Sequence, residues 1–199
     1  MNSSKGTRRA EAGKLRIIGG KYRSRTLRVA ARPGLRPTPD RVRETLFNWL
    51  GQDLSGLACL DLFAGSGALG FEAASRGAAR VVMIEQDRIA LAELHRSRAA
   101  LGAEQVRIVA GDANAFLARE KECFDVVFLD PPFRQNAGPA LLAKLAPRLQ
   151  RGARVYVESA TPVAALWPWT ELKQARAGQV SYQLFRWDGH DQSGLSGNV

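Results

Sequence analysis

Features that mark secreted or membrane proteins are scarce in this sequence of 199 residues. It has two cysteines, Cys59 and Cys123, each beside an apolar run, and their spacing gives neither a disulfide framework nor a metal site. The longest stretch without a charged residue is 159–170, which is interrupted by two prolines. A membrane span needs about 20 apolar residues. The N-terminus is polar and basic and shows no apolar signal region, so we expect a cytoplasmic protein.

The residue patterns of common covalent catalysts are also missing. Neither cysteine lies in a Pro-Cys pair or beside a base, so attack on a pyrimidine ring carbon is not expected. Ser66 lies in Ala-Gly-Ser-Gly-Ala and not in Gly-x-Ser-x-Gly. His95 falls within an expected helix and His190 near the C-terminus, where both are expected to be exposed and not catalytic.

The net charge of +10 is confined to one end of the chain. The first fifty residues contain thirteen Lys or Arg and three Asp or Glu, whereas the other 149 carry sixteen of each sign. A genome rich in G and C would favour Arg over Lys, but it would not place the whole excess at one end. Because Lys and Arg neutralise phosphates, this asymmetry predicts an arm that binds nucleic acid.

The chain is expected to have four parts. Residues 1–13 form a disordered basic tail, 14–51 a basic N-terminal hairpin and helix, 52–187 the main domain, and 188–199 a flexible tail. The hairpin strands are expected at 15–18 and 26–29. Asp40 is the expected N-cap of the helix that follows, and Gly51 ends that helix.

Strands and helices alternate through the main domain. The expected strands are 57–63, 80–84, 106–109, 124–129 and 154–157, and the expected helices are 68–76, 88–101, 113–119 and 141–149. Residues 171–177 and 179–187 predict an antiparallel pair around Gly178. This order predicts an α/β fold, a doubly wound Rossmann-like sheet that is mostly parallel with an antiparallel C-terminal strand, plus a small basic N-terminal extension. Such sheets bind ligands at the carboxyl ends of their strands.

A glycine-rich turn follows the first strand of this domain. Residues 65–70 read Gly-Ser-Gly-Ala-Leu-Gly, and Glu85 ends the next strand, where an acid can hold ribose hydroxyls. This spacing fits a nicotinamide dinucleotide and also S-adenosyl-L-methionine (SAM). Asp61, just before the turn, favours SAM because a carboxylate repels a pyrophosphate and attracts the cationic amino end of methionine. A purely structural tight turn is the simpler alternative.

Two further acids end strands of the same sheet. Asp112 follows the third strand and could accept the adenine amino group, but a helix N-cap explains it equally well. Asp130 ends the fourth strand and is followed by Pro131, Pro132 and Phe133. The prolines have no N–H to donate, so the carboxylate and the Pro131 carbonyl form an acceptor-only site suited to an exocyclic amine. Phe133 offers a ring against which an unstacked base could lie, although a strand-ending turn is the simpler alternative.

These motifs resemble the signatures of SAM-dependent amino-methyltransferases. Together with residues 16–23 (RIIGGKYR) and 34–50 (GLRPTPDRVRETLFNWL), they are similar to the RsmD family over roughly residues 15–187. The resemblance implies a SAM-dependent methyltransferase domain over 52–187. It also implies methyl transfer to the N2 amine of a guanine in bacterial 16S ribosomal RNA. The RNA could be free or part of an assembling small-subunit particle, and we expect the protein to be a monomer.

The resemblance and the spacing together define the expected site. The catalytic residues are Asp130, Pro131, Pro132 and Phe133. The cofactor-binding residues are Thr38, Asp61, Phe63, Ala64, Gly65, Ser66, Gly67, Glu85, Gln86, Asp112 and Ala113. The RNA-binding residues are Arg16, Lys21, Tyr22, Arg23, Arg25, Arg36 and Arg41, and no metal is expected.

Three alternatives stay open at this point. The Asp-Pro-Pro-Phe motif is shared with DNA adenine-N6 methyltransferases. A nicotinamide-dependent oxidoreductase would explain the glycine turn and Glu85, but it gives no role to the acceptor-only loop or the basic arm. A non-catalytic RNA-binding protein would explain only the arm.

Overall fold

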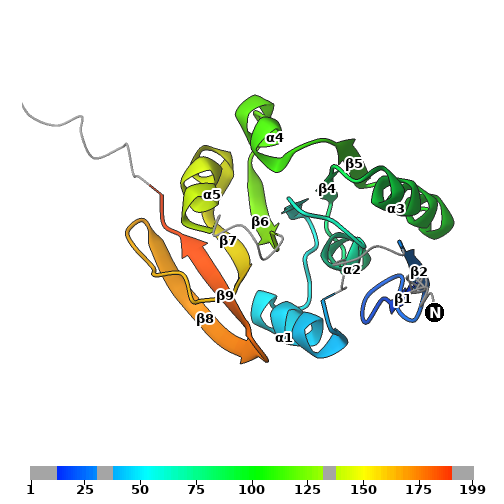
Figure 1. Cartoon of the computed structure of the whole chain (residues 1–199), viewed down its shortest axis with the longest axis horizontal. Helices are drawn as coiled ribbons and strands as arrows, with labels where there is room; N and C mark the ends of the chain where they lie inside the picture. The colour runs from blue at the N-terminus through cyan, green and yellow to red at the C-terminus, as the bar shows by residue number, and fades with distance from the viewer. Residues whose placement is uncertain (1–12, 31–37, 132–137, 190–199) are drawn as a thin grey trace, which may run out of the picture.

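The fold is built on a seven-stranded sheet flanked by helices on both faces (Figure 1). The structure is a computed structural model, and it describes residues 13–30, 38–131 and 138–189. The strands are β1 Gly13–Arg16, β2 Thr26–Val29, β3 Ala58–Asp61, β4 Arg80–Glu85, β5 Val106–Ala110, β6 Phe124–Leu129, β7 Leu149–Ser159, β8 Trp169–Ala177 and β9 Val180–Trp187. The helices are α1 Asp40–Leu50, α2 Ala68–Ser75, α3 Arg88–Leu101, α4 Ala113–Arg119 and α5 Gly138–Leu145, followed by a 3₁₀ turn at Ala146–Arg148. No helix in these ranges is long and apolar enough to cross a membrane.

The strand order is β5-β4-β3-β6-β7-β9-β8. The first five of these strands run parallel, and β9 and β8 complete the sheet in antiparallel pairing. The order reverses between β3 and β6, because the chain moves from β3 toward β5 and then returns to the other side of β3. The carboxyl ends of β3 and β6 therefore form the point at which such sheets bind ligands. This architecture confirms the expected fold class.

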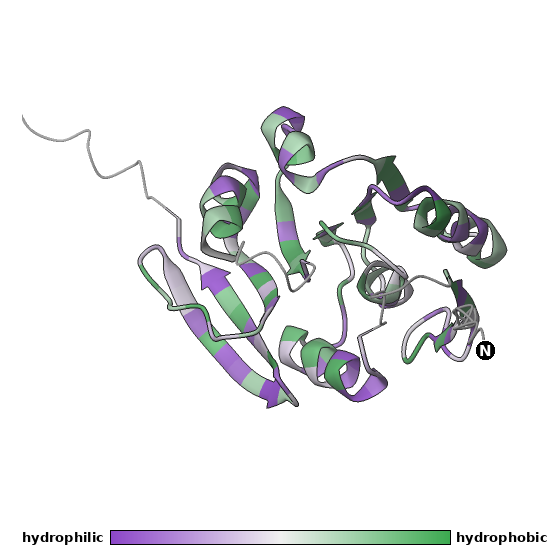
Figure 2. Cartoon of the chain, in the orientation of Figure 1, coloured by the Kyte–Doolittle hydropathy of each residue, from purple (hydrophilic) through white to green (hydrophobic). Residues whose placement is uncertain are grey.

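The two faces of the sheet pack into two hydrophobic clusters. Alternate residues of β6 belong to different clusters: Val126 and Phe128 to the first, and Val127 and Leu129 to the second. Helices α1, α2 and α3 contribute to the first cluster, whereas α4 and α5 contribute to the second. Because both faces are covered, the central strands are apolar on both sides, and β6 is green along most of its length in Figure 2.

The N-terminal hairpin belongs to the same core as the main domain. Strands β1 and β2 pair antiparallel, with Gly13 opposite Val29, and the hairpin lies beside α2 and α3 in Figure 1. Its buried residues Leu15, Ile17, Tyr22, Leu27 and Val29 join the first cluster. The basic segment is therefore folded onto the sheet domain through an apolar face of its own.

A close backbone approach fixes the turn of this hairpin. Gly20 has φ +73°, and a Cβ added there would lie 1.8 Å from the backbone oxygen of Ser75 at the end of α2. The Lys21 N–H donates to that oxygen at 2.7 Å, and the Tyr22 N–H donates to the Ser75 hydroxyl at 2.8 Å. Glycine is required at position 20 because any side chain would separate the hairpin from α2.

A buried carboxylate holds the same turn from the side. The side chain of Glu72 in α2 is fully buried, and it accepts hydrogen bonds from the backbone N–H groups of Ile18 at 2.9 Å and Gly19 at 2.8 Å. The Nε of Arg76 donates to it at 2.9 Å, and the Nη1 of Arg43 lies 3.3 Å away. Charged and polar donors thus surround the carboxylate, which is the condition for burying one at tolerable cost.

Arg43 of α1 is the fully buried partner of Glu72. Its guanidinium donates to the backbone oxygens of Thr38 at 3.2 Å and Arg16 at 3.0 Å, and to the Asp40 carboxylate at 2.6 Å. One side chain therefore connects the hairpin, the start of α1 and α2. This pair was not predicted from the sequence.

Several expected boundaries were wrong. Pro39 and not Asp40 is the N-cap of α1, and the Asp40 side chain pairs with Arg43 in place of capping. The helix expected at 141–149 ends at Leu145, because the chain tightens into the 3₁₀ turn and enters β7 at Leu149. Strand β1 lies two residues earlier than expected. The tails expected to be disordered fall almost wholly outside the described residues.

Replacing Arg43 should test how much the buried pair contributes to stability. Arg43→Ala removes one of the two guanidinium groups that bind the buried Glu72 carboxylate, and it leaves the Thr38 carbonyl without this donor. We expect the free energy of unfolding to fall by up to about 3–5 kcal/mol. Arg96→Ala is the matched control, because Arg96 also pairs with an acid one helical turn away, but its side chain is 67% exposed. Its cost should stay below about 1 kcal/mol. Urea unfolding of both variants measures the difference, and equal small decreases would contradict the role given to the pair.

Candidate active site at the carboxyl ends of the central strands

The glycine-rich turn between β3 and α2 is bonded to both neighbouring strands. The Leu62 N–H donates to the Phe128 oxygen of β6 at 3.2 Å, and the Ala64 N–H donates to the Ile84 oxygen of β4 at 2.9 Å. Gly67 has φ +78°, and a Cβ there would lie 2.6 Å from the Phe71 ring. The turn is thus fixed in place, and glycine is required at position 67 both by its positive φ and by the close packing of Phe71.

Glu85 at the end of β4 is half-buried and forms a hydrogen bond to this turn. Its carboxylate accepts from the Gly65 N–H at 2.8 Å, and from the N–H groups of Gln86 and Asp87 at 2.8 Å each. The side chain therefore lies beside the glycine turn, where a ribose was expected. The structure adds a second role, because the same carboxylate organises the loop.

Asp61 at the end of β3 is buried beneath the turn. Its Oδ2 accepts from the Gly70 N–H at 3.0 Å. Burial raises the pKa of Asp61 to about 7, and the negative charge of Glu85 adds to this rise, while hydrogen bonds from Gly70 and Phe63 oppose it. Asp61 is therefore poised to gain negative charge when a cation binds nearby.

The remaining cofactor candidates lie along the same edge. Asp112 follows β5, is exposed, and caps α4 by accepting from the Ala115 N–H at 2.9 Å, which confirms the N-cap interpretation. An adenine contact stays a prediction. Ala64, Ser66, Gly67 and Ala113 are buried, Phe63 and Gly65 are half-buried, and Gln86 is exposed. Thr38 is buried before α1, and its carbonyl accepts from Arg43.

Asp130 lies after β6 and is half-buried, and Pro131 behind it is buried. In the register of β6 and β7, Leu129 is opposite Val157, so the next residues, Asp130 and Glu158, are neighbours. Burial raises the pKa of Asp130 well above its ordinary value, and the negative charges of Glu158 and Asp61 raise it further. Pro132, Phe133 and Arg36 lie outside the described residues.

Sequence reasoning missed Glu158 and Tyr156. Both lie on β7, and the Tyr156 hydroxyl donates to Oε1 of Glu158 at 2.7 Å. Burial raises the pKa of Glu158, and the Tyr156 hydrogen bond partly offsets this rise. The expected strand ended at Val157, so the acid directly after it was never considered; its place at a strand end was the available signal.

The three acids of this edge share one face of the sheet. Side chains alternate along a strand, so Asp61 lies on the face of Cys59, Asp130 on that of Phe128, and Glu158 on that of Tyr156. Those three neighbours all belong to the first cluster, which α1 and α2 cover. The acids therefore lie together at the carboxyl ends of the strands, beside the start of α1 where Thr38 lies, and sheets of this type have their ligand crevice at that position. No group of three or more His, Cys, Asp or Glu in the described ranges could hold a metal ion.

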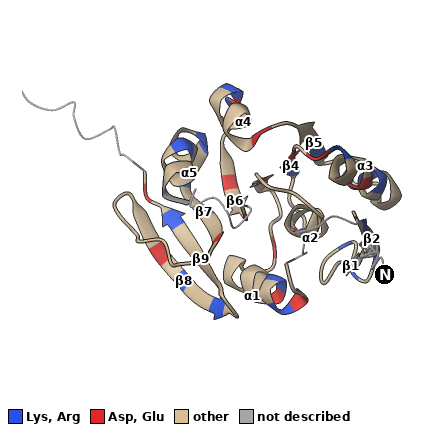
Figure 3. Ribbon diagram, in the orientation of Figure 1, with Lys and Arg blue, Asp and Glu red and all other residues tan. Residues whose placement is uncertain are grey.

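The basic residues expected to bind RNA are partly where the sequence predicted them. Arg16, Lys21, Arg23, Arg25 and Arg41 are exposed. Tyr22 is not: it is 3% exposed and packs in the core, so its expected RNA contact is corrected, because the ring serves the fold of the hairpin. Figure 3 also shows basic residues on α3, α5 and the β8–β9 edge.

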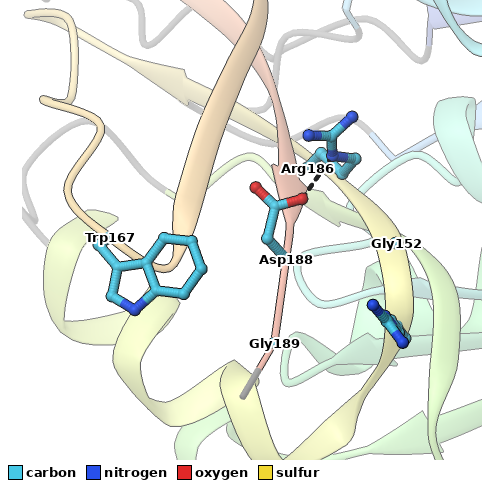
Figure 4. Close-up of a pocket in the computed structure, with 6 residues that line it drawn as sticks. Gly152, Trp167, Arg186, Asp188 and Gly189 are labelled. Atoms are coloured by element: carbon cyan, nitrogen blue, oxygen red, sulfur yellow. Dashed lines mark hydrogen bonds and ion pairs between the residues drawn. The ribbon is translucent and has the colours of Figure 1, made fainter. Parts of the chain in front are cut away.

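A hollow of about 380 Å³ lies at the opposite edge of the sheet. It is lined by Arg151, Gly152, Trp167, Arg186, Asp188 and Gly189. Figure 4 shows Asp188 between Trp167 and Arg186, and the Arg186 Nε lies 2.6 Å from the Asp188 carboxylate. These residues come from the first part of β7, from the segment before β8 and from the end of β9, so the hollow is separate from the acids at the carboxyl ends of β3, β4 and β6.

The donor and acceptor set of the crevice fits SAM. Acids end β3 and β4, and a third follows β5, beside a bare glycine turn. Such acceptors suit an ammonium group, a ribose diol and an adenine amine, respectively. No described ion pair places a Lys or Arg on Asp61, Glu85 or Asp112. The pyrophosphate of a nicotinamide dinucleotide would be repelled by the Asp61 carboxylate, so this acid argues against such a cofactor.

Comparison with known proteins gives consistent matches. A family model described as "Conserved hypothetical protein 95" matches residues 15–186. The chain is 43% identical over 188 residues to ribosomal RNA small subunit methyltransferase D of Escherichia coli K12, covering 92% of this chain and 94% of that protein. It is 42% identical over 182 residues to the Haemophilus influenzae protein of that name, covering 87% and 94%. The solved structure of Escherichia coli yhhF superposes with a TM-score of 0.82 at 44% identity, covering 89% of this chain and 100% of that one.

The raised pKa of Asp61 predicts a pH-dependent stability difference. The unfolded carboxyl loses its proton near 3.8 and the folded one near 7, so ionisation increasingly favours the unfolded chain across that window. Asp61→Asn keeps an oxygen for Gly70 but cannot ionise. Relative to the wild type it should therefore gain stability as pH rises from about 4 to about 7, by up to roughly 4 kcal/mol at about 1.4 kcal/mol per pH unit.

Urea unfolding at several pH values measures this difference. Asp53→Asn is the control, because the pKa of the exposed Asp53 is lowered by its hydrogen bonds to Ser55. Asp53 is therefore already ionised in both the folded and the unfolded chain through most of this window, and its difference from the wild type should stay flat. A flat difference for Asp61→Asn as well would contradict the buried, weakly acidic carboxyl.

Proposed function

The chain belongs to the RsmD family, matched here as conserved hypothetical protein 95, and from this premise we propose that it methylates an exocyclic amine of 16S ribosomal RNA with SAM as the methyl donor. The curated relatives that it matches are named for the RNA of the small ribosomal subunit. We further propose that the amine is N2 of a guanine. A monomer acting in the cytoplasm, on free RNA or on an assembling small-subunit particle, belongs to the same proposal.

The position of Asp130 beside the glycine turn carries this proposal. Strands β3 and β6 are paired neighbours, so the turn that follows β3 and the acid that follows β6 meet at one point. The turn is the place for the methyl donor, and Asp130 with the Pro131 carbonyl is the place for the amine. Accepting both amine hydrogens would direct the nitrogen lone pair at the methyl group.

Different residues of the chain are proposed to bind the cofactor and to orient the target amine. Bound SAM supplies an activated methyl group on a sulfonium. Glu85 would hold the ribose hydroxyls, Asp61 the cationic amino end, and Asp112 the adenine amine. Asp130 and Pro131 orient the target nitrogen, and Thr38, fixed by Arg43, would close the crevice from the side of α1. Phe133 is proposed to stack against the extruded base.

The hairpin supports RNA as the substrate. Four exposed basic residues, Arg16, Lys21, Arg23 and Arg25, lie on a hairpin that is bonded to α2, the helix that follows the glycine turn. A phosphate backbone bound there would be held near the crevice. Neither a nicotinamide oxidoreductase nor a non-catalytic binding protein uses both features, and the relatives named for rRNA favour RNA over DNA adenine.

Two substitutions should separate cofactor binding from methyl transfer. Glu85→Ala should weaken SAM binding by about 1.5–3 kcal/mol, because a charged acceptor is removed. Asp130→Ala should leave SAM affinity nearly unchanged and abolish transfer, because the amine loses its acceptor. Calorimetry with SAM and single-turnover transfer to 16S rRNA measure the two effects. The proposal fails if Asp130→Ala transfers methyl groups at a near wild-type rate, and the ribose role fails if Glu85→Ala binds SAM normally.

The basic hairpin should contribute to RNA affinity by neutralising phosphates. Replacing Arg16, Lys21, Arg23 and Arg25 with Ala should weaken binding to every RNA sequence. It should also reduce the slope of log K against log salt by roughly 0.7–0.9 for each phosphate that is no longer neutralised. A control variant with Arg96, Arg119, Lys121 and Arg176 replaced removes the same charge from other exposed positions. SAM binding should survive in both. Equal salt dependence of the two variants would argue against a specific role for the hairpin.

A further inference from the structure

Asp130 has a second carboxylate beside it. The pairing of Leu129 with Val157 places Asp130 after β6 next to Glu158 of β7, with both side chains on the sheet face covered by α1. Asp130 is half-buried, whereas Glu158 is 8% exposed and lies deeper. Two carboxylates so placed cannot both be ionised without strong repulsion, and such pairs commonly share one proton.

Tyr156 decides where the charge of this pair lies. Its ring is fully buried, and its hydroxyl donates to Glu158 at 2.7 Å. A hydrogen bond to the ionised form stabilises that form, so Glu158 is the better site for the negative charge. The hydrogen bond from Tyr156 therefore places the shared proton on Asp130, and the charge of Glu158 contributes to the raised pKa of Asp130.

The other groups that face the pair do not neutralise it. Asp61 lies at the end of β3, Glu85 lies beyond Asp61 at the end of β4, and Tyr182 lies on β9 with its ring centroid 6.4 Å from that of Tyr156. The ion pairs within the described ranges include neither Asp130 nor Glu158. These ranges also contain no metal-holding group of acids that would include the pair. Among the described residues, a shared proton is the remaining way to lower the charge of the pair.

We propose that Asp130 and Glu158 act as one pair carrying a single negative charge, in which Glu158 is a positioning residue. Protonated Asp130 donates a hydrogen bond to the Glu158 carboxylate and presents its carbonyl oxygen to the amine, and the Tyr156 hydroxyl stabilises the charge on Glu158. This rests on the proposed function, in which the amine meets Asp130. As the N–C bond forms and the S–C bond breaks, the sulfonium becomes a thioether and the nitrogen becomes cationic. The nitrogen then loses one proton to the pair, which becomes neutral and returns that proton to water.

The pH dependence of single-turnover transfer tests the pair. If one negative charge on the pair suffices, activity is lost on the acid side only when both carboxyls are protonated. In Glu158→Gln the charge must come from Asp130 alone, which is the weaker acid, so the acid limb should move to higher pH. Tyr156→Phe should move it in the same direction, because Glu158 loses its hydrogen bond.

The rival accounts predict different results. If Asp130 must itself be the anion and Glu158 only repels it, Glu158→Gln relieves the repulsion and the limb moves to lower pH. If Glu158 is merely structural, the rate falls without any movement of the limb. Either result overturns the proposal. Glu104→Gln, an exposed acid after α3, is the matched control and should leave the profile unchanged.

An infrared titration of the carboxyl C=O bands tests the pair without RNA. The wild type should show two separated steps for the pair besides the step of Asp61. Asp130→Asn and Glu158→Gln each leave one of the two carboxyls, and thermal unfolding checks that each variant is folded. In a pair, the surviving carboxyl should titrate between the two wild-type steps, because the repulsion between the two carboxylates is gone. If the wild type transfers no methyl group to 16S rRNA but the surviving step moves in this way, the proposed function fails and the proton-sharing pair stands. If the surviving step stays at its wild-type position in both variants, the two carboxyls are independent and the pair is wrong whatever the activity.

Discussion

The buried contact between Arg43 and Glu72 is the constraint on which the arrangement of the rest depends. Helix α2 is buried over its whole length, so a carboxylate in its middle must find its donors inside the protein. It finds them in the hairpin backbone and in α1, and Arg43 extends the network to the carbonyl of Thr38. The segment that carries the excess charge and the helix that follows the glycine turn are thereby parts of one unit. In the proposed function, RNA bound by this segment is therefore positioned relative to SAM bound at the glycine turn.

The sequence predicted the parts of the fold that are governed by local pattern. Residues 88–101, 113–119 and 124–129 have the observed bounds, because apolar periodicity and the caps Gly102 and Asp112 lie within or beside each segment. The N-cap prediction at Asp40 was wrong because the Asp40 carboxylate pairs with Arg43 one helical turn later, and Arg43 is itself held by the distant Glu72. The Arg43–Glu72 pair joins residues 29 positions apart, and no local pattern marks it.

The sequence predicted the acids of the candidate site only where it also predicted the ends of the strands that carry them. Asp61, Glu85 and Asp130 were found because each ends a strand with a visible apolar run. Glu158 ends one too, but β7 extends two residues beyond the expected strand, and nothing in the sequence shows that β7 pairs with β6 in the register that places two acids together. Register depends on the packed sheet. The chemical consequence, a weakly acidic Asp130, was therefore visible only in the structure.

The hairpin is attached to α2 through its backbone, whereas its exposed side chains are the part proposed to contact RNA. Four of its backbone N–H groups, from Ile18, Gly19, Lys21 and Tyr22, bind Glu72 and Ser75. A backbone donor is the same whatever side chain its residue carries, so these anchors do not depend on the exposed basic residues between and around them. Those residues are free to vary over evolutionary time without loosening the hairpin. The surface that we propose for RNA binding can therefore be changed by single substitutions, while Gly20, which has no room for a side chain, must stay as it is.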